Sequence, residues 1–323
     1  MAPIKIVITG GAGQIAYSLI PPLCSGIVFG ADQPVIISLL DITPAMAMLA
    51  GVVMEVEDLA YPLVAGVSGT DDPMVAFKDA DYAVFLGAFP RKEGMERKDV
   101  MQKNIGIFNS QGAALNTAKP TVKCVVVGNP ANTNANILAR AAPSIPKKNI
   151  TALTRLDHNR ANSMIAIKCG VSVADVSGVF IWGNHSSTQY PDVRHATVGG
   201  EAVMQKCDKE WLEGEFVTTV QKRGAAIIAA RKLSSAASAA KAICDHLHDW
   251  VLGSDKIISM AIDSTENPYG VPPGLVYSFP VKCSQGEYQI VSGLSIDEFS
   301  QAKMDATAAE LGEEMQLALS LLG

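Results

Sequence analysis

Residues 4–16 read Ile-Lys-Ile-Val-Ile-Thr-Gly-Gly-Ala-Gly-Gln-Ile-Ala, a β-branched run followed by glycines and the start of a helical pattern. The spacing Gly10-x-x-Gly13-x-x-Ala16 is a variant of the fingerprint with which a backbone binds a pyrophosphate. Gly10 permits a tight turn, and Gly13 lets backbone N–H groups approach an anion at the positive end of the helix. Ala16 permits close packing of helix on strand. The segment therefore predicts a nucleotide site at this strand–helix junction.

The first half of the chain repeats this order of strand and helix. Nearly continuous apolar runs, typical of strands buried on both faces of a parallel sheet, occur at 4–9, 35–40, 82–86, 122–127 and 150–153. Between them lie helix-length segments at 14–24, 45–59 and 99–118. The alternation predicts an α/β fold, with a doubly wound parallel Rossmann sheet over residues 1–153.

The second half, residues 154–323, has a mixed pattern that predicts an α+β domain. The helical segments are 157–169, a long stretch 214–251 with a bend near Ser234 and Ser235, and 296–322. Antiparallel strands joined by Pro, Gly and Ser turns are predicted at 257–262, 276–281 and 288–294. We therefore expect a nucleotide-binding half, residues 1–153, followed by a second domain, residues 154–323.

Length and composition agree with two domains and exclude several partners. The 323 residues fit two domains of about 150 residues each. A net charge of −6 argues against nucleic acid or an anionic membrane as partner, since both need a basic face. The apolar stretch 15–40 is interrupted by prolines, glycines and Asp32, so no membrane span is expected. Six cysteines without a Cys-x-x-Cys pair, and a strand already at Ile4, favour a cytoplasmic location.

The end of the second predicted strand indicates which dinucleotide binds. Asp41 follows Leu40 there, and a carboxylate at this position accepts hydrogen bonds from ribose hydroxyls and repels a 2′-phosphate. We therefore predict NAD as cofactor. Glycine-rich turns of this kind also occur in short-chain dehydrogenases and epimerases, which need Tyr-x-x-x-Lys. No tyrosine of this chain is followed four residues later by lysine, so that class lacks its acid–base pair here.

Acid–base and cationic residues gather in three other segments. Asp157 and Arg160 are three apart after the fifth strand and would share a helix face. His185 lies on a predicted loop after Trp182, and residues 87–98 form a charged segment with glycine hinges, typical of a lid. Together these segments supply an oriented base and several guanidinium groups beside a nucleotide site.

Six stretches of the chain carry these features: Thr-Gly-Gly-Ala-Gly-Gln-Ile-Ala, Leu-Asp-Ile-Thr-Pro, Pro-Arg-Lys-Glu-Gly-Met-Glu-Arg-Lys-Asp, Val-Gly-Asn-Pro-Ala-Asn-Thr-Asn, Thr-Arg-Leu-Asp-His-Asn-Arg and Trp-Gly-Asn-His-Ser. Taken together, they resemble NAD-dependent malate dehydrogenases of the cytosolic type, within the lactate/malate dehydrogenase superfamily. The resemblance implies an NAD-binding half, residues 1–153, followed by a catalytic half, residues 154–323. The likeness runs in register from residue 4 to the C-terminus. It implies malate and oxaloacetate as substrates, an enzyme of malate metabolism and the tricarboxylic acid cycle.

The resemblance implies a role for each polar residue of the site. His185 would be the general acid/base at C2, and Asp157 would fix its tautomer and stabilise the imidazolium. Arg160 would bind the carboxylate next to C2, and Arg97 would polarise the carbonyl oxygen of oxaloacetate. Arg91 would pair with the distal carboxylate. A neutral side chain stands there in lactate dehydrogenases, so Arg91 predicts oxaloacetate over pyruvate.

The cofactor contacts are likewise implied by the resemblance. Asn129 would touch both the nicotinamide ribose and the substrate, and the Asn129–Pro130 bond would be cis. Beside Gly10, Gly13 and Asp41, the expected cofactor contacts are Gln14, Ile15, Asn104, Gln111 and Val127.

Two further expectations concern metal and assembly. His246 and His248 are two apart on a predicted helix and point in different directions, so we expect surface histidines and no metal site. The helix at 45–59 has more apolar residues than one buried face needs, and in the family it forms part of a dimer contact. We therefore predict a two-fold homodimer.

Two alternatives remain open. One is another 2-hydroxyacid dehydrogenase of the same superfamily, and the other is a non-catalytic NAD-binding protein on the same fold.

Overall fold

The strand, turn and helix at the N-terminus are those that the sequence predicts. A computed structural model describes residues 1–89 and 95–322 of the chain. Strand β1 (Ile4–Thr9) is followed by Gly10, whose φ of +68° lies in the left-handed region that favours glycine. A Cβ atom at Gly10 would also lie 3.0 Å from the backbone nitrogen of Gly87. Gly13 then caps helix α1 (Gln14–Cys24).

The first compact unit comprises residues 1–152 and 313–323. Its elements after α1 are β2 (Val35–Leu40), the 3-10 turn η1 (Thr43–Ala45), α2 (Met46–Asp58), β3 (Val64–Thr70), α3 (Pro73–Phe77), β4 (Tyr82–Phe85), α4 (Arg97–Leu115), β5 (Lys123–Val126), α5 (Ala131–Ala141), η2 (Lys147–Asn149) and β6 (Ile150–Ala152). Six of its strands follow the order β6-β5-β4-β1-β2-β3, and each pair is parallel. This is the strand order of a Rossmann sheet, so the predicted fold class is confirmed.

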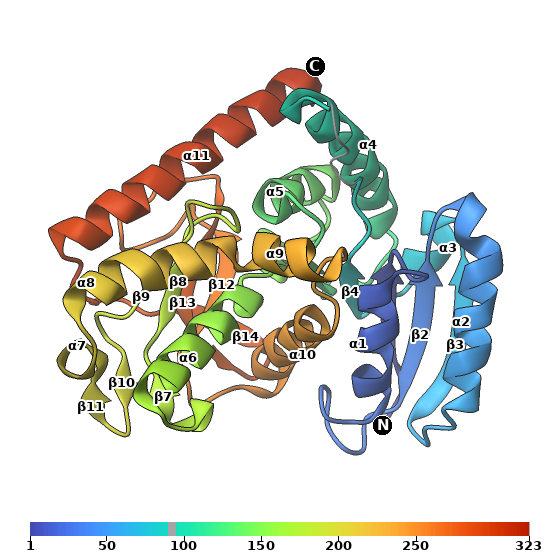
Figure 1. The fold of residues 1–323 in the computed structure, drawn as a ribbon. Coiled ribbons are helices and arrows are strands. Elements are labelled where there is room, and N and C mark those ends of the chain that lie inside the picture. Colours follow the sequence, from blue (N-terminus) through green and yellow to red (C-terminus); the bar gives the residue numbers. More distant parts are fainter. Residues whose placement is uncertain (90–94, 323) are drawn as a thin grey trace. The chain divides into compact units, whose positions relative to one another are not determined.

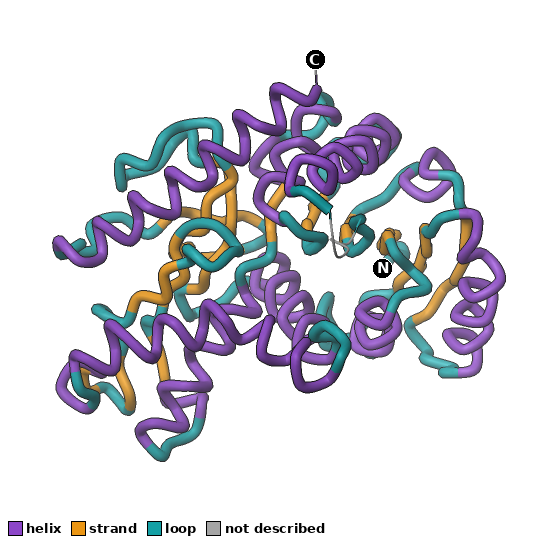
Figure 2. Tube along the Cα trace, turned by 45° about the horizontal axis from the view of Figure 1, so that its top comes forward, coloured by secondary structure: helices purple, strands orange, loops and turns teal. Residues whose placement is uncertain are grey.

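Helices of the first unit form two layers around this sheet. Helix α1 packs against α2, while α4 packs against both α3 and α5. Figure 2 shows helices, in purple, on both sides of the orange strands. The strands β1, β4 and β5 are almost entirely buried between the layers, which explains their continuous apolar sequence. Because all six strands are parallel, their carboxyl ends lie at one edge of the sheet.

The second compact unit comprises residues 153–312. Its elements are α6 (Arg155–Cys169), η3 (Val173–Asp175), β7 (Val176–Ser177), β8 (Phe180–Trp182), β9 (Tyr190–Asp192), β10 (Thr197–Val198), β11 (Glu201–Ala202), α7 (Val203–Lys206), α8 (Lys209–Trp211), the π-helix η4 (Leu212–Phe216), α9 (Val217–Arg231), α10 (Ala237–Leu252), β12 (Ile258–Asp263), β13 (Val276–Ser284), β14 (Glu287–Ile290) and α11 (Glu298–Leu322). The antiparallel meander β12-β13-β14 confirms the three strands predicted there. The last residues of α11 group with the first unit, where Thr133 donates to Glu314 at 2.6 Å. The proposed domain boundary after residue 153 stays a prediction.

The predicted long helix 214–251 is in fact two helices. Helix α9 ends at Arg231, and Lys232 adopts a left-handed conformation with φ +60° before α10 begins (Figure 1). A non-glycine residue in this conformation interrupts the helical hydrogen-bond ladder. The break lies beside the serines at which a bend was expected.

The prediction that His246 is a surface residue is wrong. Its side chain is completely buried on α10 and packs edge-on against Trp250, with ring centroids 5.9 Å apart. Helix α10 buries a wide face, and His246 lies on that face, so it belongs to the core although its side chain is polar. His158 on α6 is buried as well, with Nδ1 3.0 Å from Ser259 Oγ. Among the residues that the structure describes, no cluster of His, Cys, Asp and Glu suits a metal ion.

These two buried histidines predict that the fold loses stability in mild acid. Burial, and the positive charge of Arg155, lower the pKa of His158 and the pKa of His246 to about 3. Between pH 6.5 and 3 these histidines bind protons in the unfolded chain but stay neutral in the folded chain. The free energy of unfolding therefore falls as pH falls. Each histidine contributes a slope of up to about 1.4 kcal/mol per pH unit. Urea unfolding at several pH values should give a shallower slope for His158→Gln and for His246→Gln. Equal slopes in all three proteins would contradict this explanation.

No helix in the described parts of the chain has the length and hydropathy that crossing a bilayer requires.

Candidate active site

The second unit brings His185 and Asp157 together. Asp157 lies in the first turn of α6 and is completely buried, while His185 follows β8 and keeps one fifth of its side chain exposed. The Nδ1 atom of His185 forms a hydrogen bond with Oδ2 of Asp157. A buried carboxylate that accepts from one ring nitrogen orients the imidazole, so a proton exchanged with a substrate would pass through Nε2.

Each member of the pair shifts the pKa of the other toward the charged form. Burial alone would favour the neutral ring of His185, but the charge and hydrogen bond of Asp157 outweigh it and raise the pKa of His185. Burial would also raise the pKa of Asp157, yet His185 and then Arg160 and Gln189 hold it below its usual value. The pair therefore keeps a carboxylate ionised next to a ring that binds a proton readily.

Arg160 is next to this pair, one helical turn from Asp157. Its Nη1 lies 3.3 Å from Asp157 Oδ1, and its Nη2 donates to Ser235 Oγ at 3.1 Å. Burial and the positive charge of Arg223 lower the pKa of Arg160, against the attraction of Asp157. The guanidinium is thus oriented by two partners within the second unit.

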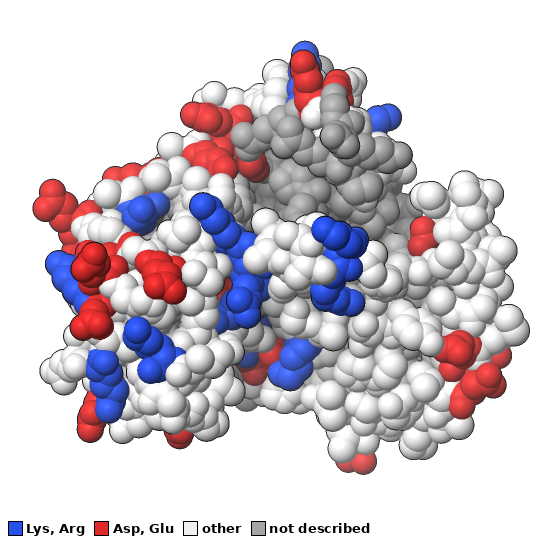
Figure 3. Space-filling view, in the orientation of Figure 1, with Lys and Arg blue, Asp and Glu red and all other residues white. Residues whose placement is uncertain are grey.

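Helix α9 also brings positive charge near Arg160, since Arg223 of this helix lowers the pKa of Arg160. Basic side chains gather over α9 in the middle of the face drawn in Figure 3, and Lys222, Arg223 and Arg231 of that helix are exposed. Such a field attracts small anions toward the site.

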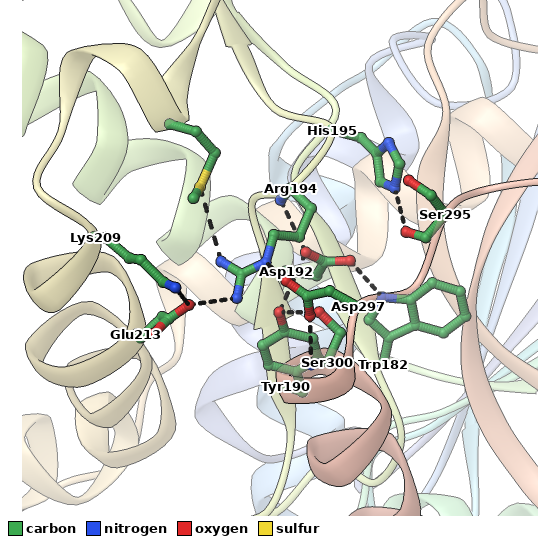
Figure 4. A network of polar contacts seen from close by, with 11 residues as sticks. Trp182, Tyr190, Asp192, Arg194, His195, Lys209, Glu213, Ser295, Asp297 and Ser300 are labelled. Carbon is green, nitrogen blue, oxygen red and sulfur yellow. Dashed lines mark hydrogen bonds and ion pairs between the residues drawn. The ribbon is translucent and has the colours of Figure 1, made fainter.

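A β-hairpin presents His185. Strands β8 and β9 pair in antiparallel register, and residues 183–189 form the loop between them. The buried Asp192 on β9 accepts a hydrogen bond from Trp182 Nε1 at 3.1 Å and from the Tyr190 hydroxyl at 3.3 Å (Figure 4). Arg194, two residues further along, forms ion pairs with Glu213 at 2.6 Å and with Asp297 at 2.7 Å. Both ends of the His185 loop are therefore fixed.

Helix α11 holds the loop itself through residues that the sequence did not suggest. Glu310 Oε2 accepts hydrogen bonds from Asn184 Nδ2 at 2.9 Å and Thr188 Oγ1 at 2.6 Å, and also from Ser186 Oγ. Thr307 Oγ1 accepts from the backbone nitrogen of Asn184 at 2.9 Å. Asn184 and Glu310 are 126 positions apart, so no local motif could have indicated their contact.

Gln189 is the other polar residue that the sequence analysis missed. Its Nε2 donates to Asp157 Oδ1 at 3.2 Å and to the backbone oxygen of Ser186 at 3.1 Å. Gln189 therefore joins the carboxylate to the loop that carries His185.

The glycine turn of the first unit fits a dinucleotide. Gly13 caps α1 without a side-chain hydrogen bond, and no acidic residue stands in the first turn of the helix. Gly13 and Gln14 are exposed, and Ile15 is half-buried. A Cβ at Gly13 would lie 3.1 Å from Gly10 oxygen, so a larger residue would crowd the turn. Donor groups at an uncapped, positive helix end suit a pyrophosphate.

Asp41 lies next to this turn, as the sequence predicts for a ribose-binding carboxylate. Its Oδ2 accepts from the backbone nitrogen of Ala12 at 2.9 Å, and its Oδ1 accepts from Ile42 nitrogen at 2.8 Å. These contacts hold the carboxylate beside the glycine turn at the end of β2.

The other expected cofactor contacts have different surroundings. Val127 and the exposed Asn129 follow β5, and the Asn129–Pro130 bond is cis, as expected. Asn104 is fully buried, and its amide binds the backbone of Phe89 at 2.8 and 3.1 Å. This arrangement favours an anchoring role for Asn104. Gln111 Oε1 is buried without a hydrogen-bond partner among the described residues.

Two of the predicted arginines cannot be placed. Arg91 and the side chain of Arg97 lie outside the described residues, although the backbone of Arg97 begins α4. The roles of both residues stay predictions.

Comparisons with known proteins agree with this arrangement. The family description "lactate/malate dehydrogenase, NAD binding domain" matches residues 4–151, and "lactate/malate dehydrogenase, alpha/beta C-terminal domain" matches residues 154–321. A cytoplasmic malate dehydrogenase of Zea mays is 58% identical over 99% of this chain and 98% of its own length.

Solved structures of both enzyme types resemble the chain. The malate dehydrogenase of Naegleria fowleri has 46% identity and a TM-score of 0.96, covering 99% of each chain. The lactate dehydrogenase of Trichomonas vaginalis, in complex with NADH and oxamate, has 38% identity and a TM-score of 0.95 over the same shares.

These findings confirm the predicted resemblance, the enzyme class and NAD as cofactor. The two family descriptions match the two halves of the chain in order and leave few residues unmatched. The chain therefore belongs to the lactate/malate dehydrogenase family.

Proposed function

We propose that this chain catalyses NAD-dependent interconversion of malate and oxaloacetate, with His185 as the general acid/base. The observation that carries the proposal is the buried carboxylate–imidazole pair, Asp157 with His185, next to the oriented guanidinium of Arg160. The fold alone does not distinguish the two substrates, since a malate and a lactate dehydrogenase resemble it equally well. The full-length identity with cytoplasmic malate dehydrogenases therefore supports malate as the substrate.

The protein residues act on the proton and the carboxylates. NAD, when bound, supplies the nicotinamide ring that accepts or returns the hydride of C2. In malate oxidation, Nε2 of His185 takes the hydroxyl proton, and Asp157 stabilises the imidazolium that forms. In the reverse direction the same imidazolium returns the proton to the carbonyl oxygen. Arg160 binds the carboxylate next to C2 and thereby orients the reacting carbon.

Gly10, Gly13, Gln14, Ile15 and Asp41 would hold the cofactor at the glycine turn. The backbone donors suit the pyrophosphate, and the carboxylate of Asp41 suits the adenosine ribose while repelling a 2′-phosphate. Asn129, Val127 and Gln111 complete the proposed contacts.

A steady-state assay tests the function directly. Oxaloacetate should be reduced far faster with NADH than with NADPH, and far faster than pyruvate. Comparable turnover of pyruvate would instead favour the alternative of a lactate-type dehydrogenase. No turnover of either keto acid would favour a non-catalytic NAD-binding protein.

The Asp157–His185 pair predicts a specific pH dependence. Reduction of oxaloacetate needs protonated His185, so kcat/KM should fall as pH rises through its pKa, which Asp157 raises. In Asp157→Asn the negative charge that raises the pKa of His185 is lost, so the fall in kcat/KM should begin at lower pH. Malate oxidation needs the neutral ring, and its acidic limb should also move to lower pH. The pH profiles of kcat/KM in both directions, in wild type and variant, measure these shifts. An unmoved limb in Asp157→Asn would contradict the assignment of this pair.

We also propose a cytoplasmic homodimer. Met48 and Met54 on α2 and Tyr17 on α1 are more than half exposed, which leaves an apolar surface on the first unit for a second copy. Light scattering should then give twice the mass of the 34.0 kDa chain, and Met54→Glu should weaken the assembly.

The maize relative is named as cytoplasmic, in agreement with the location expected here.

A further inference from the structure

Two cysteines that the proposed reaction does not use have their sulfur atoms in contact. Cys169 is the last residue of α6 and Cys207 follows α7, and their Sγ atoms are 3.6 Å apart. All six cysteines of the chain are free thiols. The Sγ atoms must approach by roughly 1.6 Å to reach a disulfide bond length.

The surroundings make the two thiols unequal. Cys169 is partly exposed, whereas Cys207 is 7% exposed. Burial and then the hydrogen bond with Cys169 raise the pKa of Cys207 to about 11. Cys207 therefore keeps its proton and can donate it to the sulfur of Cys169. Lys168 precedes Cys169 and has its Nζ 4.7 Å from the Trp211 ring, and its positive charge acts against the rise in the pKa of Cys207. The nucleophile of a thiol is its thiolate form.

We propose that Cys169 and Cys207 are a peroxide-sensitive dithiol that forms an intramolecular disulfide. The Cys169 thiolate attacks one oxygen of hydrogen peroxide, the O–O bond breaks, and the departing hydroxide takes up a proton to become water. Cys207 then loses its proton and attacks the sulfur of the resulting sulfenic acid. The S–O bond breaks, a second water leaves, and two electrons have passed from the thiols to the peroxide.

The position of this disulfide would matter for the proposed active site. It would join the C-terminal end of α6, the helix that carries Asp157 and Arg160, to the residue after α7. The loop that it closes, residues 169–207, contains the whole hairpin that presents His185. The oxidised chain should therefore unfold at a higher temperature than the reduced one, because the cross-link restricts the unfolded chain.

Peptide mapping after peroxide treatment tests the proposal. The full-length protein is treated with equimolar hydrogen peroxide, unfolded, alkylated and digested with trypsin without reduction. Cleavage after Lys168, Arg194, Lys206 and Lys209 should release residues 169–194 linked to residues 207–209. Four thiols should be alkylated instead of six, and dithiothreitol should restore six and lower the melting temperature again.

Three serine variants make the result specific. Cys207→Ser should stop at a sulfenic acid on Cys169 that dimedone traps, and Cys169→Ser should keep all its thiols. Cys244→Ser, which removes a buried thiol elsewhere in the second unit, should still form the linked peptide. A link between two chains, oxidation of Cys169 alone in the wild type, or six alkylated thiols would each overturn the proposal.

Discussion

Replacing His185 with asparagine should lower kcat for oxaloacetate reduction by about 10²–10⁴-fold, the usual contribution of a general acid–base group. Asparagine can still hydrogen-bond to the buried Asp157, but its amide neither gives nor takes a proton near neutral pH. KM should change much less, because Arg160 and the other carboxylate-binding groups remain. The dependence of kcat on the pKa of His185 should disappear together with the rate.

A second histidine of the same unit provides the matched control for this prediction. His195 contacts the backbone oxygen of Ser295 at 3.0 Å (Figure 4). Asp157 instead contacts His185, Arg160 and Gln189. His195→Asn should therefore keep the wild-type kcat and pH profile. Circular dichroism and thermal unfolding show whether each variant is folded. A folded His185→Asn enzyme with unchanged kcat would exclude the proposed acid–base role and favour a different catalyst.

Replacing Arg91 with glutamine should remove most of the preference for oxaloacetate over pyruvate. A site built to bind a polar group rejects analogues that lack it by roughly 10⁴-fold or more, because its own partner is left buried and unpaired. In the variant, oxaloacetate should lose the cation that we expect at its distal carboxylate, and pyruvate should no longer leave a guanidinium unpaired. We expect kcat/KM to fall for oxaloacetate and to rise for pyruvate.

The neighbouring lysine separates this specific effect from a general loss of positive charge. Lys92→Gln removes the same charge one residue away and should leave the ratio of kcat/KM for the two keto acids close to that of the wild type. If both variants change the ratio equally, long-range attraction of the dianion explains the preference. If neither changes it, Arg91 does not select the substrate, and another cation must do so.

Much of the first unit was predictable because its strands are buried on both faces. Five strands, including β1 and β2, were found within two residues of their ends from apolar runs alone. Strand β3 was missed, since Gly66 and Gly69 and its half-exposed residues blur the pattern. Helix α5 was missed because asparagines recur in it, and these are poor helix formers that only its buried surroundings support.

The sequence by itself determined the family and NAD as cofactor, and it predicted the cofactor turn and the acid–base residues, because each of these lies in a short stretch with a characteristic spacing. Residues such as Asp157 and Arg160 share one helical turn, so their proximity follows from the helix alone. Only the tertiary structure decided that Glu310 and Thr307 hold the His185 loop, that His246 is buried, and that Cys169 touches Cys207. These contacts join segments far apart in the chain, and packing between elements, which no local pattern records, brings them together.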